Sequence, residues 1–325
     1  MSGKTAKKQA SNRMAPLKSA LAAAAVMLMT AAWAESPMPE EFARKLLELG
    51  PAIDGPDTAK LYAPLQEKEP YRGVKVERDV KYGAADRNLL DVFMPATASP
   101  PRPVLIFVHG GAFVAGDRRE SGTPFYDNIM LWAVRNGFVG VNMTYRLAPQ
   151  AKWPVGAEDI GSAVQWVANN IGGRGGDPAR IYLMGHSAGA VHVASYVSHP
   201  EFYKVKGSGL AGAIMVSGFY DLTAMQLGDP ERAYFGADPS RYADESSLRG
   251  LATTNIPLMI VAAEMDPAIF RRQFELLKDA TCKTGSGCAR ALILPQHNHM
   301  SEVYSINTAD TRLTDQILDF VKAGK

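Results

Sequence analysis

The chain alternates short apolar runs with stretches of helical periodicity, and this alternation limits the folds open to it. The runs are of the continuous apolar kind expected of strands buried on both faces: PVLIFVHGG, GFVGVNMTY, RIYLMG, LAGAIMVSG, IPLMIVAAE and ARALILP. Helical patterns lie between them, at about residues 124–136, 157–170, 188–199, 267–280 and 301–322. Such alternation predicts an α/β fold, a parallel sheet with helices on both faces. The earlier segments VKVERDVKYG and LLDVFMP predict an antiparallel start, which makes a mostly parallel sheet of eight strands.

The first 34 residues do not fit this pattern. Five basic residues and no acidic ones precede the apolar run ALAAAAVMLMTAAWA, and Ala32-Trp33-Ala34 has the small-x-small form of a signal-peptidase site. These features predict a secretory signal peptide over residues 1–34 and export to the periplasm or the outside of the cell. An uncleaved anchor is the alternative, and Met14 is a second candidate start.

Removal of that segment reverses the charge of the chain. The whole sequence has 35 basic and 33 acidic residues, so the mature part has 30 against 33, a net charge of about −3. With no basic stripe in the mature part, we expect no nucleic-acid partner. The only two cysteines, Cys282 and Cys288, lie in the flexible segment CKTGSGC and predict a disulfide. Two thiols with no nearby histidine do not predict a metal site.

The segment GHSAGA places Ser187 directly after a predicted strand and before a predicted helix. It fits the pattern G-x-S-x-G, in which the glycines allow a sharp turn that lifts a serine hydroxyl above the edge of the sheet. The alternative is a plain structural turn. We interpret Ser187 as a nucleophile.

A serine nucleophile needs a base, because its hydroxyl is barely ionised at neutral pH. Of the six histidines, His109 and His186 lie within glycine motifs, and His192 and His199 lie on the helix after Ser187. The segment QHNHMSE after the last strand leaves His297 and His299 as the competing candidates. We expect His299 to be the base and His297 to help shape the loop.

The acid that orients the base should follow another strand, between the serine and the histidine in chain order. IVAAEMDPAIF places Glu264 and Asp266 after the seventh strand. Asp266 is our candidate, although an Asp before Pro is also a good helix cap. Asp221, after the sixth strand, is the rival acid.

The segment VHGGAF supplies the fourth element. Acyl transfer builds negative charge on the carbonyl oxygen of the substrate, and backbone N–H groups must already point at that oxygen. We assign this oxyanion hole to the N–H groups of Gly111, Ala112 and Ala188. A phosphate-binding loop is the alternative for a glycine pair, but no Lys-Ser or Lys-Thr follows.

With these elements in this order, residues 74–322 resemble an α/β-hydrolase, specifically the hormone-sensitive-lipase-like carboxylesterases. PVLIFVHGGAFVAGD is similar to that family's His-Gly-Gly segment, and YRLAPQAKWPVGAEDI to its Tyr-Arg-Leu-Ala-Pro block, in which Asp159 would be structural. The chain departs from the family at His186, Ala112 and Met300. These departures favour the neighbouring feruloyl-esterase-like and kynurenine-formamidase-like groups.

The resemblance implies a serine esterase that works through an acyl-enzyme on a small-molecule ester, with no metal or cofactor. An amidase or peptidase with the same triad is the second hypothesis. A catalytically inactive hydrolase fold that serves as a binding module is the third.

Two segments are expected to cover the pocket: an N-terminal helical cap over residues 35–72, with Phe42, Leu46, Leu47 and Leu49 at helical spacing, and residues 220–250. The catalytic domain would then span residues 73–325. Six aromatic residues lie near the expected mouth, and we expect two of them to touch substrate: Phe113, Trp153, Phe219, Tyr220, Tyr234 and Phe235.

Overall fold

The computed structural model describes residues 38–324 apart from 52, 54, 98 and 284–286. The chain divides into two units, Met1–Ala34 and Glu35–Lys325. The predicted signal peptide therefore lies outside the described residues, and the fold is that of the second unit.

One sheet of eight strands carries the fold, in the order β1-β2-β4-β3-β5-β6-β7-β8. The first two pairings, β1 with β2 and β2 with β4, are antiparallel, and all the others are parallel. The eight predicted strands and their mostly parallel arrangement are confirmed. Their bounds are β1 Val74–Lys81, β2 Leu89–Pro95, β3 Arg102–Val108, β4 Val139–Met143, β5 Gly176–His186, β6 Gly212–Val216, β7 Leu258–Ala263 and β8 Arg290–Leu294.

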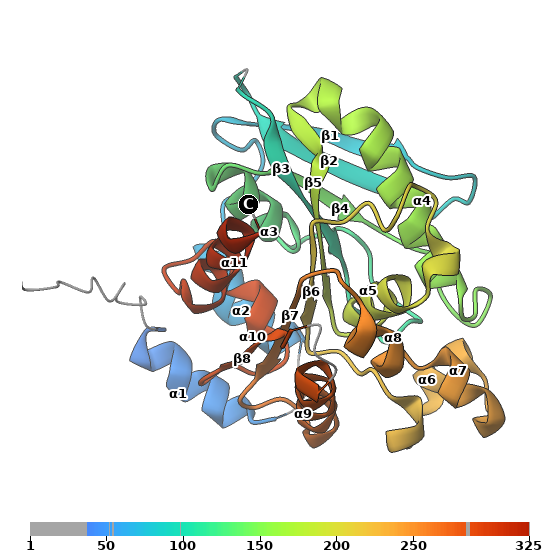
Figure 1. Ribbon diagram of the computed structural model, residues 1–325. Coiled ribbons are helices and arrows are strands. Elements are labelled where there is room, and N and C mark those ends of the chain that lie inside the picture. The colour runs from blue at the N-terminus through green and yellow to red at the C-terminus, as the bar shows by residue number, and fades with distance from the viewer. Residues whose placement is uncertain (1–37, 52, 54, 98, 284–286, 325) are drawn as a thin grey trace, which may run out of the picture. The chain divides into compact units, whose positions relative to one another are not determined.

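Helices cover both faces of this sheet (Figure 1). On one face pack α3 (Asp127–Arg135) and α11 (Arg312–Ala323), and on the other α4 (Val155–Asn170), α5 (Ala188–Ser198) and α9 (Ala268–Lys283). Strand β3 shows why its sequence is continuously apolar: Ile106 packs towards one of these layers and Phe107 towards the other. Three shorter helices, α6 (Asp229–Phe235), α7 (Tyr242–Glu245) and α8 (Leu248–Thr253), precede β7.

The single helix predicted over residues 301–322 is wrong. The structure has a short α10 (Ser301–Tyr304) and then α11, with an irregular connection between them. Asn307 in that connection has φ 70°, a left-handed conformation that an α-helix cannot contain. Asp310 then accepts a hydrogen bond from the backbone N–H of Arg312, the first residue of α11.

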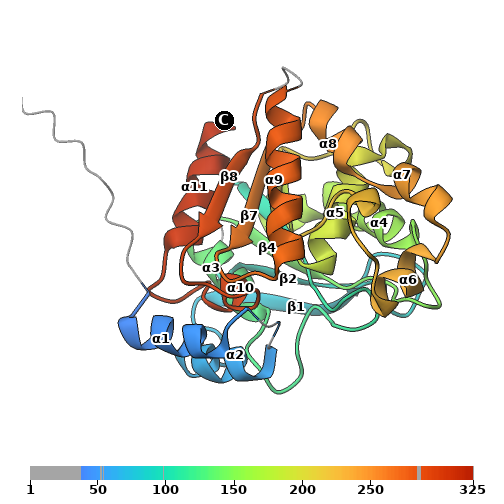
Figure 2. The same cartoon turned by 90° about the horizontal axis from the view of Figure 1, so that it is seen from below.

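The N-terminal segment forms α1 (Glu40–Leu49), α2 (Gly55–Tyr62) and a 3₁₀ turn over Ala63–Leu65. The apolar residues that the helical spacing singled out in α1 are not all buried: Leu46 is buried, whereas Leu47 is 71% exposed. Helix α2 lies beside α10 (Figure 2). The Gln66 amide fixes this arrangement by donating to the carbonyl oxygens of Tyr304 and Ile306 at 3.1 and 3.0 Å.

Candidate active site

Ser187 occupies a strained turn between β5 and α5. Its backbone has φ 55° and ψ −124°, a conformation that costs a non-glycine residue about 1–3 kcal/mol. The flanking glycines make the turn sterically possible. A Cβ at Gly189 would lie 2.1 Å from the carbonyl oxygen of Val108, and one at Gly185 would lie 2.4 Å from that of Gly189. The pattern G-x-S-x-G is thus required by the close approach of α5 to the sheet.

His299 and Asp266 meet at the carboxyl ends of β7 and β8. The Nδ1 of His299 lies 2.7 Å from Oδ1 of Asp266, and both side chains are buried. Oδ2 of Asp266 accepts the backbone N–H of Ala263 at 2.9 Å. Within the described residues, Nε2 of His299 has no hydrogen-bond partner. When the proton of the imidazole is on Nδ1, Nε2 carries a free lone pair, as a general base requires.

His186, the residue before Ser187, holds His299 in place. Its Nε2 donates to the carbonyl oxygen of His299 at 2.8 Å, and the two rings lie 4.7 Å apart. Phe270 packs on the same imidazole with a centroid separation of 4.6 Å. Burial lowers the pKa of His186 well below its usual range, so the ring stays a neutral donor. Sequence reasoning placed His186 only in a glycine motif and missed this role.

The turn after β3 presents two backbone N–H groups. Gly111 has φ 118° and Ala112 has φ 50°, and neither N–H has an acceptor within the described residues. A Cβ at Gly111 would lie 2.2 Å from the carbonyl oxygen of Ala115, so this position requires glycine. Tyr145 anchors the turn by donating to the carbonyl oxygen of His109 at 3.0 Å. Ala188, the third predicted donor, is the first residue of α5, where a helix leaves its N–H free.

Several of these groups line one cavity of about 800 Å³. Ser187, His299 and the segment 110–112 line it on one side, and Ala59 and Ala63 line it from the N-terminal segment. Glu120 also lines it, and its carboxylate accepts the hydroxyl of Tyr304 at 3.1 Å. The N-terminal segment therefore supplies a wall of the cavity, as expected of a cap.

The expected cover from residues 220–250 is wrong for this cavity, since no residue of that segment lines it. The six aromatic residues predicted at the mouth do not line it either, whereas Tyr126 and Tyr304 do. The ring of Phe113 stacks on Tyr234 with centroids 4.8 Å apart, inside a separate apolar cluster that also contains Phe219 and Phe235. The left-handed backbone of Phe113, with φ 68°, accompanies its burial in that cluster.

The rival candidates have other partners. His297 contacts Asp310 at 3.1 Å and the hydroxyl of Ser301 at 2.9 Å, which fits the predicted role in shaping the loop. Asp221 caps the 3₁₀ turn Leu222–Ala224. Glu264 is exposed and accepts the backbone N–H of Gln296 at 2.7 Å. Asp159 binds Arg146 at 2.7 Å, in agreement with a structural role.

Cys282, at the end of α9, and Cys288 are joined by a disulfide, with Cα atoms 4.3 Å apart.

No helix of the described residues combines the length and the apolar character needed to cross a membrane.

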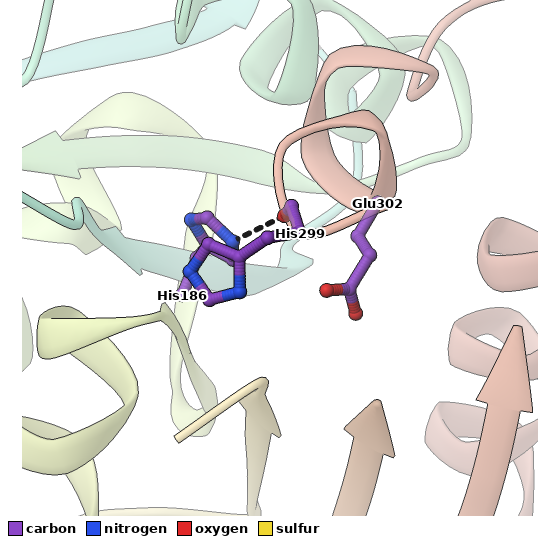
Figure 3. Close-up of side chains that lie close together, drawn as sticks. All are labelled: His186, His299 and Glu302. Atoms are coloured by element: carbon purple, nitrogen blue, oxygen red, sulfur yellow. Dashed lines mark hydrogen bonds between the residues drawn. The ribbon is translucent and has the colours of Figure 1, made fainter. Parts of the chain in front are cut away.

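Three side chains near the nucleophile are close enough to hold a cation. Figure 3 shows His186, His299 and Glu302, whose nearest donor atoms lie within 4.8 Å of one another. Each of the three also makes a hydrogen bond inside the protein: His186 to the His299 carbonyl, His299 to Asp266, and Glu302 to Ser217. We therefore interpret the cluster as a hydrogen-bonded network around the imidazole of His299.

Comparisons with known proteins identify the family of the chain. A model of the BD-FAE family matches residues 90–280, more than half of the chain. The chain is 27% identical over 264 residues to esterase LipQ of Mycobacterium tuberculosis, a match that covers 75% of this chain and 61% of LipQ. It is 27% identical over 252 residues to the kynurenine formamidase of Salmo salar, covering 74% of this chain and 80% of the formamidase.

Solved structures share the fold. Esterase B from Lactobacillus rhamnosis aligns with a TM-score of 0.68 and 17% identity, over 88% of this chain and 95% of the esterase. A hyperthermophilic esterase from the archaeon Pyrobaculum calidifontis aligns with a TM-score of 0.63 and 21% identity, over 88% of this chain and 98% of that chain. At such identities the likeness establishes an α/β-hydrolase architecture.

The glycine after the Ser187 turn gives a test of the packing. Replacing Gly189 with Ala should lower the free energy of unfolding by about 1–3 kcal/mol, because the new methyl group meets the rigid backbone of β3. Urea denaturation measures this loss. Gly172→Ala is the matched control, because a Cβ there meets no atom within 4 Å. Equal stabilities of the two variants would contradict the close contact between α5 and β3.

Buried histidines give a pH test of stability. Burial lowers the pKa of His109 to about 4 and of His192 to about 3, and it lowers the pKa of His186 and His297 as well. The unfolded chain therefore binds protons first, and stability falls as the pH drops through about 6.5. His109 and His192 should each cost about 1.4 kcal/mol of stability between about pH 7.5 and 5.5.

Urea denaturation at several pH values checks this expectation. His192→Gln should reduce the pH dependence of the free energy of unfolding by the contribution of one histidine. The ring of His192 makes no hydrogen bond within the described residues, so the substitution breaks none. A free energy of unfolding that is constant over this pH range would show that these rings take up protons in the folded protein.

Proposed function

Because the chain belongs to the BD-FAE family of α/β-hydrolases, we propose that it hydrolyses carboxylic esters through an acyl-enzyme, with Ser187, His299 and Asp266 as its catalytic triad. The observation that carries this proposal is the 2.7 Å hydrogen bond from His299 to Asp266, at a cavity that Ser187 and His299 both line. Ser187 and His299 line this cavity from different loops, and Asp266 binds His299 from a third, which supports nucleophilic catalysis by serine.

In the first step, Oγ of Ser187 attacks the carbonyl carbon of the ester, and Nε2 of His299 takes the hydroxyl proton. Asp266 keeps the imidazole in the tautomer with a proton on Nδ1 and stabilises the imidazolium that forms. The N–H groups of Gly111, Ala112 and Ala188 bind the negative charge on the carbonyl oxygen. His299 then returns the proton to the leaving alkoxide, which departs as an alcohol.

In the second step, water attacks the acyl-enzyme and His299 takes a proton from that water. Collapse of the tetrahedral intermediate releases the carboxylic acid, and His299 returns the proton to Ser187. The apolar wall contributed by Ala59 and Ala63 suits an apolar part of the ester.

Amide hydrolysis by the same groups is the second candidate. It is favoured by the likeness to a protein named as a kynurenine formamidase, which the chain matches over 80% of that protein's length. The step that differs is the departure of an amine in place of an alcohol, and His299 would protonate that amine.

Export is part of the proposal. A basic segment, an apolar run and Ala32-Trp33-Ala34 support cleavage after Ala34, and the disulfide between Cys282 and Cys288 suits an oxidising compartment. Amino-terminal sequencing of the protein recovered from the periplasm or the medium should read Glu-Ser-Pro-Met. Recovery of the full-length chain from the cytoplasm would contradict export.

The triad is tested with Ser187→Ala. This variant should lose hydrolysis of p-nitrophenyl esters by at least about 10³-fold and should not label with a fluorophosphonate, because it lacks the nucleophile. Initial rates on esters from acetate to decanoate measure the loss and size the acyl pocket. An unchanged circular dichroism spectrum and melting temperature show that the fold is intact.

Asp266→Asn and Asp221→Asn make a matched pair for the acid. The first should lower kcat by about 10⁴-fold, because the amide stabilises the wrong tautomer of His299. The second removes a carboxylate outside the site and should leave kcat within about twofold.

Wild-type protein that labels with the fluorophosphonate and yet cleaves only amides would favour the second candidate function.

A further inference from the structure

Behind Asp266 lies a second buried carboxyl group that the mechanism above does not use. Ser217, directly after β6, has its hydroxyl in hydrogen-bond contact with Oδ2 of Asp266 and also with Oε1 of Glu302 from α10. Ser217 is 1% exposed, Asp266 5% and Glu302 0%. The three side chains thus form a chain of contacts that ends at the imidazole of His299.

The two contacts of Ser217 need two hydrogens, and its hydroxyl supplies only one when both carboxyl groups are ionised. A serine hydroxyl has a single hydrogen, so Ser217 can donate to only one of the two carboxyl groups. If both carboxyl groups were ionised, Oγ of Ser217 and one carboxylate oxygen would face each other with no hydrogen between them, a repulsion that is costly in a buried site. One of the two carboxyl groups must therefore be protonated.

The surroundings decide which group holds the proton. Asp266 accepts N–H groups from His299 and Ala263, and both donors favour its ionised form. Glu302 has no such N–H donor among the described residues: its Oε1 contacts the hydroxyl of Ser217, and its Oε2 has no hydrogen-bond partner. The proton thus belongs on Glu302, and Ser217 passes its own hydrogen to Asp266.

The charged and titratable groups around Glu302 agree with this assignment. His186 and His299 lie close to Glu302 (Figure 3), Asp266 contacts the same Ser217 hydroxyl, and the hydroxyl of Tyr220 is a further neighbour. No lysine or arginine is among the groups that act on Glu302. Burial and the negative charge of Asp266 together raise the pKa of Glu302 well above its usual range.

We propose that Glu302 is a positioning residue that stays protonated and, through the hydroxyl of Ser217, fixes Asp266 for its contact with His299. The inference rests on the proposed function only in that Asp266 orients the base. With Oδ2 of Asp266 bound by Ser217 and Ala263, its Oδ1 is left to His299.

The neutral form of Glu302 matters for the proton shuttle. An ionised Glu302 would place a second negative charge near His299 and raise the affinity of the imidazole for its proton. His299 would then return that proton to the leaving group less readily, because efficient transfer needs a base of matched strength. A protonated carboxylic acid supplies the hydrogen bond without that charge.

Two substitutions separate the hydrogen bond from the charge. Glu302→Gln keeps a neutral donor of nearly the same shape and should retain kcat within about threefold. Its acidic limb in the pH profile of kcat/KM should coincide with that of the wild type, because no charge is lost. Glu302→Leu keeps the volume and removes the donor, and it should lower kcat about tenfold with KM unchanged.

Ser217→Ala removes the bridge itself and should lower kcat to a similar extent. Adding Glu302→Leu to Ser217→Ala should then cause little further loss, because both changes interrupt the same chain of hydrogen bonds. If Glu302→Leu fails to fold, Ser217→Ala and Glu302→Gln carry the test.

Infrared spectroscopy of the folded protein tests the proton without reference to activity. The carbonyl band of a protonated carboxylic acid should be present at neutral pH in the wild type and lost in Glu302→Gln. An acidic limb shifted downwards by about one pH unit in Glu302→Gln, or an infrared band that does not change, would show that Glu302 is ionised and overturn the proposal.

Equal kcat values in the wild type, Glu302→Leu and Ser217→Ala would likewise overturn the positioning role. Failure of the proposed function gives a different result, because Ser187→Ala would then keep the activity of the wild type whatever residue stands at position 302.

Discussion

The hydrogen bond between His299 and Asp266 is the contact on which the rest of the site depends. Its two residues follow different strands, β8 and β7, and lie 33 positions apart in the chain. The bond forms only if both loops are held at the same edge of the sheet, and the surrounding structure does this. His186 binds the backbone of His299 from the nucleophile turn, Phe270 packs on its ring, and the Ser217–Glu302 pair holds the far side of Asp266.

Much of the fold could be predicted because its signals are local. Strands buried on both faces give continuous apolar runs, and six such runs, with the two segments that precede them, form the eight-stranded sheet. The turn at Ser187 is also encoded locally, since two glycines and a serine between strand and helix leave few conformations. The break between α10 and α11 escaped prediction because helical periodicity continues through Asn307, where only the backbone conformation differs. The exposure of Leu47 depends on which face of α1 finds a partner, and spacing does not give that.

The supports of the site could not be predicted from the sequence. His186, Ser217 and Glu302 act through hydrogen bonds between segments that are far apart in the chain, so no spacing joins them. One signal was present: a histidine stands before the serine where related enzymes were expected to have an aspartate. The expected aromatic lining failed for a similar reason, because the direction of the Phe113 side chain is set by its left-handed backbone and by the cluster around Tyr234.

Helix α2 contacts both the cavity and the loop that contains His299, and this affects how related proteins can diversify. Thr58 on α2 accepts a hydrogen bond from the amide of Asn298, the neighbour of His299, and Ala59 forms part of the cavity wall. The stretch that matches the family model, residues 90–280, contains Ser187 and Asp266 but neither α2 nor His299. The matched stretch therefore contains Ser187 and Asp266, while segments outside it supply part of the cavity wall and His299. Changes in the N-terminal helices can reshape the cavity and, through the hydrogen bond between Thr58 and Asn298, can also shift the loop that holds His299.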